Sequence, residues 1–346
     1  MKSHKALFLA IAVVLLAVLI GVGAALLGGE NTRQNTRENT RENTRENTRA
    51  NTVPTDSSVP ETTEADVDWS TTVEQDGVLY RLNPDLQTVL FLGADDGGTA
   101  LPGVAPGEAR RADTIFLLLL DNNKQEIQLV AISRDTIADV DVYTANGDYA
   151  YTAPTHITMQ YFYGDSAARS CYLMKRAVSR LLYGMRIDGS LSLNAAGIVT
   201  IVDQLGGLTV TMPDDYTAID PRYQAGAQLT LTGSEAEHLM RYRDTSIHGS
   251  NEDRVERQVR LIKALVTKLQ ASTGLRRLEE LLKAAGDDVC SDLDAETLKK
   301  LVSYRLNPDA LTLPGNVVEG EAHDEFYVDD SALRKLLIEL YYQPVE

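Results

Sequence analysis

Hydrophobic positions are concentrated in a few runs along the chain. One uncharged run, Ala6 to Leu27, would extend about 33 Å as a helix, close to the hydrocarbon thickness of a bilayer. Three later runs, at 86–95, 110–121 and 126–133, have the length and the β-branched and aliphatic composition of buried strands. The pattern predicts an α/β domain behind an N-terminal transmembrane helix.

Charges on either side of the first run predict how the chain crosses the membrane. Lys2 and Lys5 precede the run and Glu30 follows it, so the positive-inside rule places the N-terminus in the cytosol and the rest outside the cell. A cleaved signal peptide is the alternative, but its apolar region is normally shorter. We therefore expect a single-pass anchor over residues 1–28.

A polar segment follows the predicted anchor. Residues 31–50 repeat the pattern NTRE, and the polar stretch continues to residue 77. Asn and Thr are poor helix formers, and a period of four would bring like charges together on one helical face. We expect a tether over residues 29–77 and one extracytoplasmic domain over residues 78–346.

Composition excludes several classes of function. A net charge of −17 argues against a nucleic-acid partner, because such binding depends on basic residues that neutralise phosphates. The five histidines show no metal-ligand spacing. Cys171 and Cys290 are the two cysteines of the chain, which is too few for a disulfide framework or a cysteine zinc site, and one bridge between them is the less favoured alternative to two free thiols.

Charged residues stand at the ends of the three predicted strands. Asp95 ends the first, Arg111 and Asp113 stand at the start of the second, and Arg134 and Asp135 follow the third. In an antiparallel hairpin the start of one strand lies beside the end of its partner, so the second and third sets should meet. Asp95 joins them if the first strand is parallel to the third.

A second basic group is predicted at two helix ends. Arg241 and Arg243 close a short helix, while Arg254, Arg257 and Gln258 lie in the first turns of a long helix that begins near residue 252. Basic residues at a helix N-terminus oppose its dipole, so several together indicate an anionic ligand. Surface salt bridges are the alternative for any one of these arginines. Guanidinium groups with paired carboxylates suit phosphate and a hard cation, but charge alone does not distinguish a transferase, a hydrolase and a binding module.

The motifs FLGAD, RRADT, AISRDT, HITMQYFYGD, IVDQLGGLTVTMP, LTGSEAEHLMRYR and RVERQ occur in this order. With them the sequence resembles the LytR-CpsA-Psr family of bacterial cell-envelope proteins from Leu86 to the C-terminus. The resemblance implies a three-layer α/β/α sandwich with a central mixed β-sheet, held at the membrane of a Gram-positive cell. It also implies a phosphotransferase, dependent on Mg²⁺ or Mn²⁺, that joins a polyprenyl-pyrophosphate-linked glycopolymer such as teichoic acid or capsule to peptidoglycan through a phosphodiester bond.

The resemblance implies a role for each matching residue. Asp95 and Asp113 would hold the metal, and Asp135 would orient Arg134 by an ion pair or, alternatively, act as a base. The residues implied to bind the pyrophosphate are Arg111, Arg134, Arg241, Arg243, Arg254, Arg257 and Gln258. The catalytic set is Arg134, Asp135, Asp113 and Arg243. The lipid chain would lie between the sheet and helices at 167–185 and 193–208, whose apolar residues have helical spacing.

Three positions depart from the family pattern. Ser133 stands where Pro is usual, Asp96 and Gly97 where a basic residue is common, and Asn251 where an acidic residue is usual. These departures leave open a glycopolymer-lipid binding or scaffold protein without turnover. A polyprenyl-pyrophosphate hydrolase is also open, since water would replace the sugar hydroxyl. A transcriptional attenuator is a further alternative, which the expected extracellular placement opposes.

Overall fold

A mixed β-sheet forms the centre of the domain. The structure is a computed structural model that describes residues 72–95, 111–144, 146–243, 250–271, 280–281, 283–320 and 323–345. Within them, seven strands form one sheet in the order β11-β8-β3-β4-β5-β12, with β13 also beside β5. Their bounds are β3 Leu86–Ala94, β4 Ala112–Asp121, β5 Glu126–Ile132, β8 Gly189–Leu193, β11 Val289–Ser291, β12 Arg305–Leu306 and β13 Leu311–Thr312.

The three predicted strands are confirmed as β3, β4 and β5. β4 lies between the other two and is antiparallel to both, so β3 and β5 run in the same direction. All ten residues of β4 are buried, as expected for a central strand covered on both faces. The ends of β3 and β5 therefore lie at the same edge as the start of β4.

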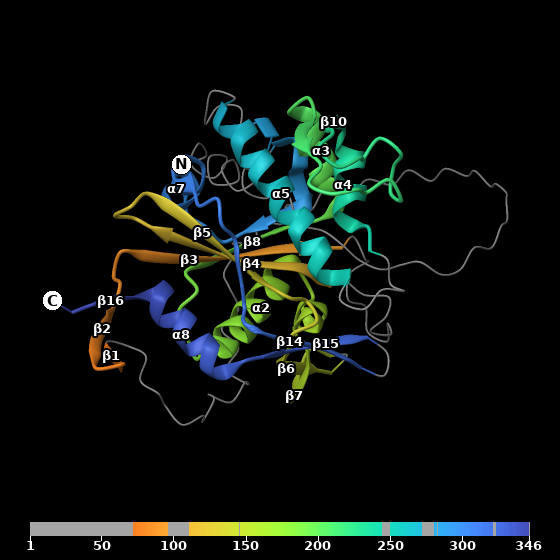
Figure 1. Ribbon diagram of the computed structural model, residues 1–346. Helices are drawn as coiled ribbons and strands as arrows, with labels where there is room; N and C mark the ends of the chain where they lie inside the picture. Colours follow the sequence, from red (N-terminus) through yellow and green to blue (C-terminus); the bar gives the residue numbers. More distant parts are fainter. Residues whose placement is uncertain are drawn as a thin grey trace, which may run out of the picture.

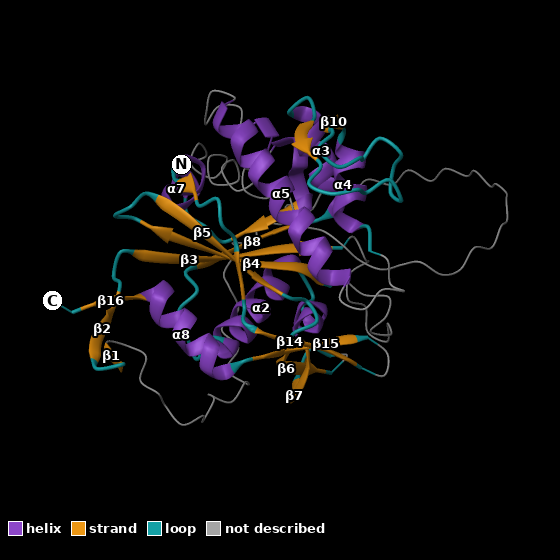
Figure 2. Ribbon diagram, in the orientation of Figure 1, coloured by secondary structure: helices purple, strands orange, loops and turns teal. Residues whose placement is uncertain are grey.

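Helices cover both faces of the sheet (Figures 1 and 2). Helices α3, α4, α5 and α7 lie on one face, and α2 and α8 on the other. Their bounds are α2 Ala167–Leu181, α3 Ala195–Gln204, α4 Gly233–Arg241, α5 Ser250–Ala271, α7 Ala295–Ser303 and α8 Asp330–Tyr341. This arrangement confirms the expected mixed α/β architecture with a central mixed sheet.

Side-chain caps begin several of these helices where the sequence changes from strand to helix. The Thr232 hydroxyl accepts the backbone N–H of Glu235, whose carboxylate in turn accepts the N–H of Thr232, a complete capping box for α4. At the N-terminus of α3, the Asn194 side chain accepts the backbone N–H of Gly197. These caps fix where α3 and α4 begin on the sheet.

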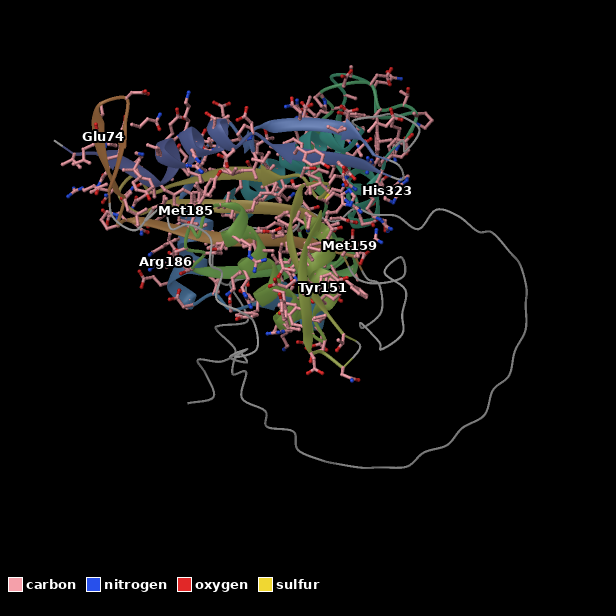
Figure 3. All side chains as sticks on the ribbon, turned by 90° about the horizontal axis from the view of Figure 1, so that it is seen from below. Glu74, Tyr151, Met159, Met185, Arg186 and His323 are labelled. Carbon is pink, nitrogen blue, oxygen red and sulfur yellow. The ribbon has the colours of Figure 1, made fainter. Side chains whose placement is uncertain are left out.

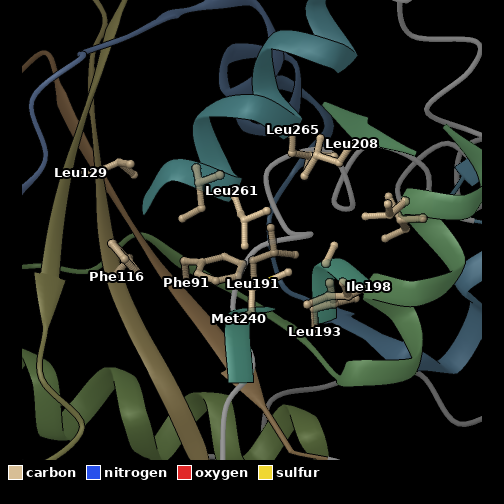
Figure 4. Packing of buried hydrophobic residues seen from close by; sticks show 14 of the residues in the cluster. Phe91, Phe116, Leu129, Leu191, Leu193, Ile198, Leu208, Met240, Leu261 and Leu265 are labelled. Atoms are coloured by element: carbon tan, nitrogen blue, oxygen red, sulfur yellow. The ribbon is translucent and has the colours of Figure 1, made fainter. Parts of the chain in front are cut away.

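Alternating residues of the central strands build two hydrophobic cores. Phe91, Phe116 and Leu129 pack toward α3, α4 and α5 together with Leu261 (Figure 4). The residues between them in each strand, such as Leu92 in β3, point to the other face of the sheet and pack toward α2 and α8. Because a strand's side chains alternate between its two faces, one continuous apolar run supplies both cores.

One three-stranded sheet and several two-stranded sheets lie outside the central sheet. The β1–β2–β16 sheet, marked by Glu74, and the β14–β15 hairpin, marked by His323, lie at opposite ends of the molecule (Figure 3). β1 lies ahead of the predicted domain start at Val78 and pairs with β2. The remaining bounds are β1 Thr72–Gln75, β2 Val78–Leu82, β6 Ile137–Tyr143, β7 Tyr149–His156, η2 Ile157–Tyr163, β9 Leu208–Thr211, β10 Gln228–Leu231, η3 Gly286–Asp288, β14 Gly315–Glu319, β15 Asp324–Val328 and β16 Tyr342–Pro344.

The predicted anchor at 1–28 and the repeat-containing tether lie outside the described residues, except for the last residues of the tether. In the part that the structure describes, no helix is both long and apolar enough to cross a membrane.

Candidate active site

The ends of three neighbouring strands meet at one edge of the central sheet. Asp95 follows β3, and its carboxylate accepts the backbone N–H of Arg111 at 2.9 Å. The backbone N–H of Asp95 also donates to the Arg111 carbonyl at 3.1 Å. These bonds fix Asp95 beside the start of β4, where Asp113 lies. Asp95 thus joins the β4 and β5 charges, as the parallel direction of β3 and β5 predicts.

Asp113 and Arg134 form an ion pair below the surface. An Nη1 atom of Arg134 contacts Oδ1 of Asp113, and the two residues are 8% and 3% exposed. The Thr158 hydroxyl donates to the Ala112 carbonyl at 2.9 Å and lies 3.5 Å from Oδ1 of Asp113. η2, which carries Thr158, therefore closes the site from the side of α2. Sequence reasoning did not select Thr158.

The turn after β5 presents Arg134 and Asp135 together. Nε of Arg134 lies 3.4 Å from Oδ1 of Asp135. The Ser133 hydroxyl accepts the backbone N–H of Asp135 at 3.2 Å, and the Ser133 carbonyl accepts the N–H of Thr136 at 3.1 Å. Ser133, one of the three departures, thus closes this turn with its own side chain. The departures at Asp96 and Gly97, and the side chain of Asn251, lie outside the described part of the chain.

Helix α5 brings a second arginine into the same buried region. Arg254 is 1% exposed, and burial lowers its pKa to about 10, although Asp113 and Asp135 oppose this by favouring the charged form. The charges of Arg134 and Arg243 lower the pKa of Arg254 further. Arg134, Arg243 and Arg254 thus lie near Asp113 and Asp135, and a bound anion can replace these carboxylates as the partner of the guanidinium groups.

Arg243 connects the site to the C-terminal hairpin. Its guanidinium lies 3.8 Å from Asp135 and 3.3 Å from Asp324, the first residue of β15. Phe326, two residues later, donates its backbone N–H to the Asp135 carbonyl at 2.8 Å. Sequence reasoning missed Asp324 because it stands in an acidic stretch that resembles a solvated surface segment, and no local motif distinguishes it.

Two of the predicted phosphate ligands have other contacts. Nε of Arg257 donates to the Leu239 carbonyl at 3.2 Å, and the guanidinium of Arg257 lies over the Tyr216 ring at 5.2 Å. Arg241 is exposed and forms an ion pair with Glu237 at 2.8 Å. Arg257 therefore holds the end of α4 against α5, and Arg241 extends along the outer surface of α4.

Gln258, which follows Arg257 in α5, is fully buried. Neither its side-chain nitrogen nor its side-chain oxygen has a hydrogen-bond partner among the described residues. A buried amide without a partner is unfavourable by itself, which fits a group that binds a ligand.

Burial has a large effect on Asp113. It raises the pKa of this carboxyl from 3.8 to about 7, against the charges of Arg134, Arg254 and Arg111. The nearby charge of Asp95 raises it further. Asp113 therefore exchanges a proton near neutral pH when no cation is bound.

The carboxylates of Asp95 and Asp113 fit a hard cation whose remaining ligands would be phosphate oxygens and water. Oδ2 of Asp113 has no hydrogen-bond partner among the described residues, and Asp95 lies close enough to affect its protonation. No group of three or more potential metal ligands occurs in the described part of the chain. Mg²⁺ commonly binds through one or two carboxylates and completes its shell with substrate phosphate and water, so two carboxylates suffice.

A cavity of about 500 Å³ opens beside the ion pairs. Ser133, Asp135 and Asp324 are among its polar lining residues, together with Glu256, Arg260, Lys263 and Asp309. Its apolar lining includes Val255 and Val259 of α5, Ala310 and Leu313 on either side of β13, Val317 of β14 and Phe326 of β15. None of its lining residues belongs to α2 or α3, the helices expected to enclose a lipid, because the apolar residues of those helices pack into the two cores.

A family model described as the LytR_cpsA_psr family matches residues 34–339. The chain is 25% identical over 267 residues to the polyisoprenyl-teichoic acid–peptidoglycan teichoic acid transferase TagU of Enterococcus faecalis, covering 75% of this chain and 80% of that protein. It is 27% identical over 237 residues to an uncharacterised protein of Staphylococcus aureus, covering 66% of this chain and 54% of that protein's length.

Solved structures show the same fold at low identity. Bacillus subtilis TagU aligns with a TM-score of 0.55 and 19% identity, over 76% of this chain and all of that chain. A structure of TagT bound to LI-WTA aligns with a TM-score of 0.55 and 20% identity, over 74% of this chain and 90% of that chain. These structures support the central sheet with helices on both faces.

Proposed function

This chain belongs to the LytR_cpsA_psr family, and from that membership and the geometry of its site we propose that it is a phosphotransferase of the cell envelope. The proposed donor is a glycopolymer on a polyprenyl pyrophosphate, and the acceptor is peptidoglycan. The observation that carries the proposal is the buried group of Asp113, Arg134 and Arg254 beside an apolar cavity. A lipid diphosphate needs both a cationic region and an apolar one.

The arginines bind the diphosphate in this proposal. Arg134 and Arg254 are buried, so their charges are weakly screened by solvent and act strongly on phosphate oxygens. Asp135 and Asp324, which both line the cavity, hold Arg243 by ion pairs. Arg241, which is exposed, would contribute through the field near the surface rather than by the contacts seen here.

The reaction exchanges one phosphorus–oxygen bond for another. The acceptor sugar hydroxyl attacks the phosphorus that carries the glycopolymer, loses its proton, and forms the new phosphodiester. The bond from this phosphorus to the bridging oxygen breaks, and polyprenyl phosphate leaves with that oxygen. Asp95 and Asp113 would hold Mg²⁺ or Mn²⁺, which would neutralise charge on the diphosphate. The arginines stabilise the charge that spreads over the phosphoryl oxygens, which is the main requirement of phosphoryl transfer.

The cavity accounts for the lipid part of the donor. Aliphatic residues such as Val255, Leu313 and Val317 line it, and Asp135, which also lines it, lies next to Arg134. A polyprenyl chain in the cavity would place its diphosphate at the strand ends. The membrane anchor and the placement of this domain outside the cell are further parts of the same proposal.

The direct test uses the full chain in detergent with Mg²⁺, a synthetic polyprenyl-pyrophosphate oligosaccharide and peptidoglycan fragments. Mass spectrometry would detect a phosphodiester-linked product, which we expect from the wild type. Lipid binding without any product would instead support a binding or scaffold protein. Polyprenyl phosphate release without a linked product would support a hydrolase.

A further inference from the structure

The two cysteines of the chain are neighbours in the fold, although they are far apart in the sequence. Cys171 lies in α2 and is buried, and Cys290 lies in β11, an edge strand of the central sheet. Both are free thiols, and their side chains are close enough that each thiol affects the pKa of the other. The expectation from sequence, which favoured two free thiols over a bridge, took no account of this proximity, because spacing along the chain carries no information about it.

Independent contacts hold the two backbone segments together at this point. Lys175, one helical turn after Cys171, forms an ion pair with Asp292, two residues after Cys290. Asp292 also accepts the backbone N–H and the hydroxyl of Ser190 in β8. α2 packs against both β8 and β11. The segments that carry the two cysteines are therefore held against each other, and a disulfide requires such proximity.

The two thiols differ in their access to solvent. Cys290 is half-buried and lines a cavity of about 40 Å³ together with Asp95 and Ser192. The Cys171 side chain lies deeper, in the core between the sheet and α2. The interaction between the two thiols lowers the pKa of Cys290 and, with burial, raises that of Cys171. Cys290 is thus the thiol that meets an oxidant first.

We propose that Cys171 and Cys290 form a disulfide that links helix α2 to the edge strand β11 in the exported protein. The proposal rests on the extracytoplasmic placement given under the proposed function, since thiols persist in the cytosol and are oxidised outside it. It adds a covalent modification site beside the candidate metal ligand Asp95.

Oxidation requires an external disulfide, such as that of a thiol–disulfide oxidoreductase or oxidised glutathione. The Cys290 thiolate attacks one sulfur of that disulfide and forms a mixed disulfide with it, and the other sulfur leaves as a thiolate. Cys171 then loses its proton and attacks the Cys290 sulfur, which releases the second external thiol. The two cysteines lose two electrons and two protons in all, and the external disulfide gains them.

The link would connect two segments that are separated along the chain by residues 172–289, which include β8, α3, α4 and α5. It would fix β11 at the edge of the sheet and the wall of the small cavity that Asp95 shares. A disulfide that closes a long loop restricts the unfolded chain, so its reduction should lower the melting temperature by about 4–10 °C.

The test counts thiols in the full chain, purified in detergent after export by the host and without reductant. The protein is alkylated in denaturant before and after reduction and analysed by mass spectrometry. We expect no alkylation before reduction and two alkylated cysteines after it. Two alkylated cysteines in exported, unreduced protein, even after incubation with oxidised glutathione, would overturn the proposal.

Melting curves give a second readout. The wild type should lose about 4–10 °C on reduction, and the double variant Cys171→Ser, Cys290→Ser should show no shift because it has no thiol to reduce. An equal shift in both proteins would contradict a stabilising link. Alkylation needs no variant, and neither measurement uses transfer activity, so failure here is distinct from failure of the proposed function.

Discussion

Arg134 forms its ion pair with Asp113 in a position where both side chains are buried. Burying two opposite charges costs desolvation that their attraction offsets only in part, and removing one leaves the other uncompensated. Such a pair is a poor device for stability alone. Its position at the strand ends, next to Arg254 and Asp95, agrees with a site that exchanges internal charge pairs for an anionic ligand.

Asp324 should position Arg243 without being essential. We expect Asp324→Asn to lower kcat about tenfold, because Arg243 would keep Asp135 but lose its charged partner on β15. KM for the donor should change less. Glu325→Gln is the matched control, since Glu325 contacts the Tyr327 hydroxyl instead. An equal loss in both variants would show that hairpin β14–β15, rather than the ion pair, determines the effect.

The stability of the metal-free protein should depend on Asp113 between about pH 4 and pH 7. The folded-state pKa of Asp113 is about 7 and its ordinary value is 3.8, so the folded state binds this proton more tightly. The stability of the wild type relative to Asp113→Asn should therefore be highest below pH 4, fall as the pH rises to 7, and stay constant above it. Urea unfolding at several pH values with EDTA measures this difference. A difference that does not change with pH would contradict the account.

Filling the apolar cavity should impair the lipid donor selectively. Ala310 lines the cavity, and Ala310→Trp would place a large ring in it. We expect about tenfold weaker binding of a long polyprenyl diphosphate and little change for a short-chain analogue. Val318→Trp is the control, because Val318 is exposed on β14 next to the cavity-lining Val317. Equal weakening of both ligands would place the lipid elsewhere.

Removal of divalent cations should abolish transfer. EDTA should stop product formation, and added Mg²⁺ or Mn²⁺ should restore it. Asp95→Asn should raise the Mg²⁺ concentration for half-maximal activity about tenfold, because one of two carboxylates is lost. Asp85→Asn, at the other end of β3 and bonded to Asn123, serves as the control. Full activity in EDTA would refute the metal assignment.

The sequence predicted the sheet and the meeting of its charged ends. β3, β4 and β5 are long, apolar and bounded by polar residues, so their hydrophobic pattern was strong enough to place Asp95, Asp113 and Arg134 together. Pairing rules for hairpins then supplied the geometry without any knowledge of side-chain contacts.

Contacts between distant segments could not be predicted in this way. Asp324 reaches Arg243 because β15 packs beside the turn after β5, and nothing local in the acidic stretch indicates this. Arg257 follows the same helical spacing as Arg254, yet it bonds to the end of α4. Both outcomes depend on how helices and hairpins dock on the sheet, which is set by tertiary packing rather than by periodicity.

The most direct test of the account compares Arg134→Ala with Arg305→Ala in the transfer assay. Arg134 follows the end of β5, whereas Arg305 lies in β12 beside the start of β5, where it is exposed in an ion pair with Glu126. Arg134→Ala should lower kcat/KM for the phosphodiester product at least about 100-fold, while Arg305→Ala should keep wild-type activity. Equal product from Arg134→Ala, folded as shown by its melting curve, would contradict the central claim that the buried arginine binds the diphosphate.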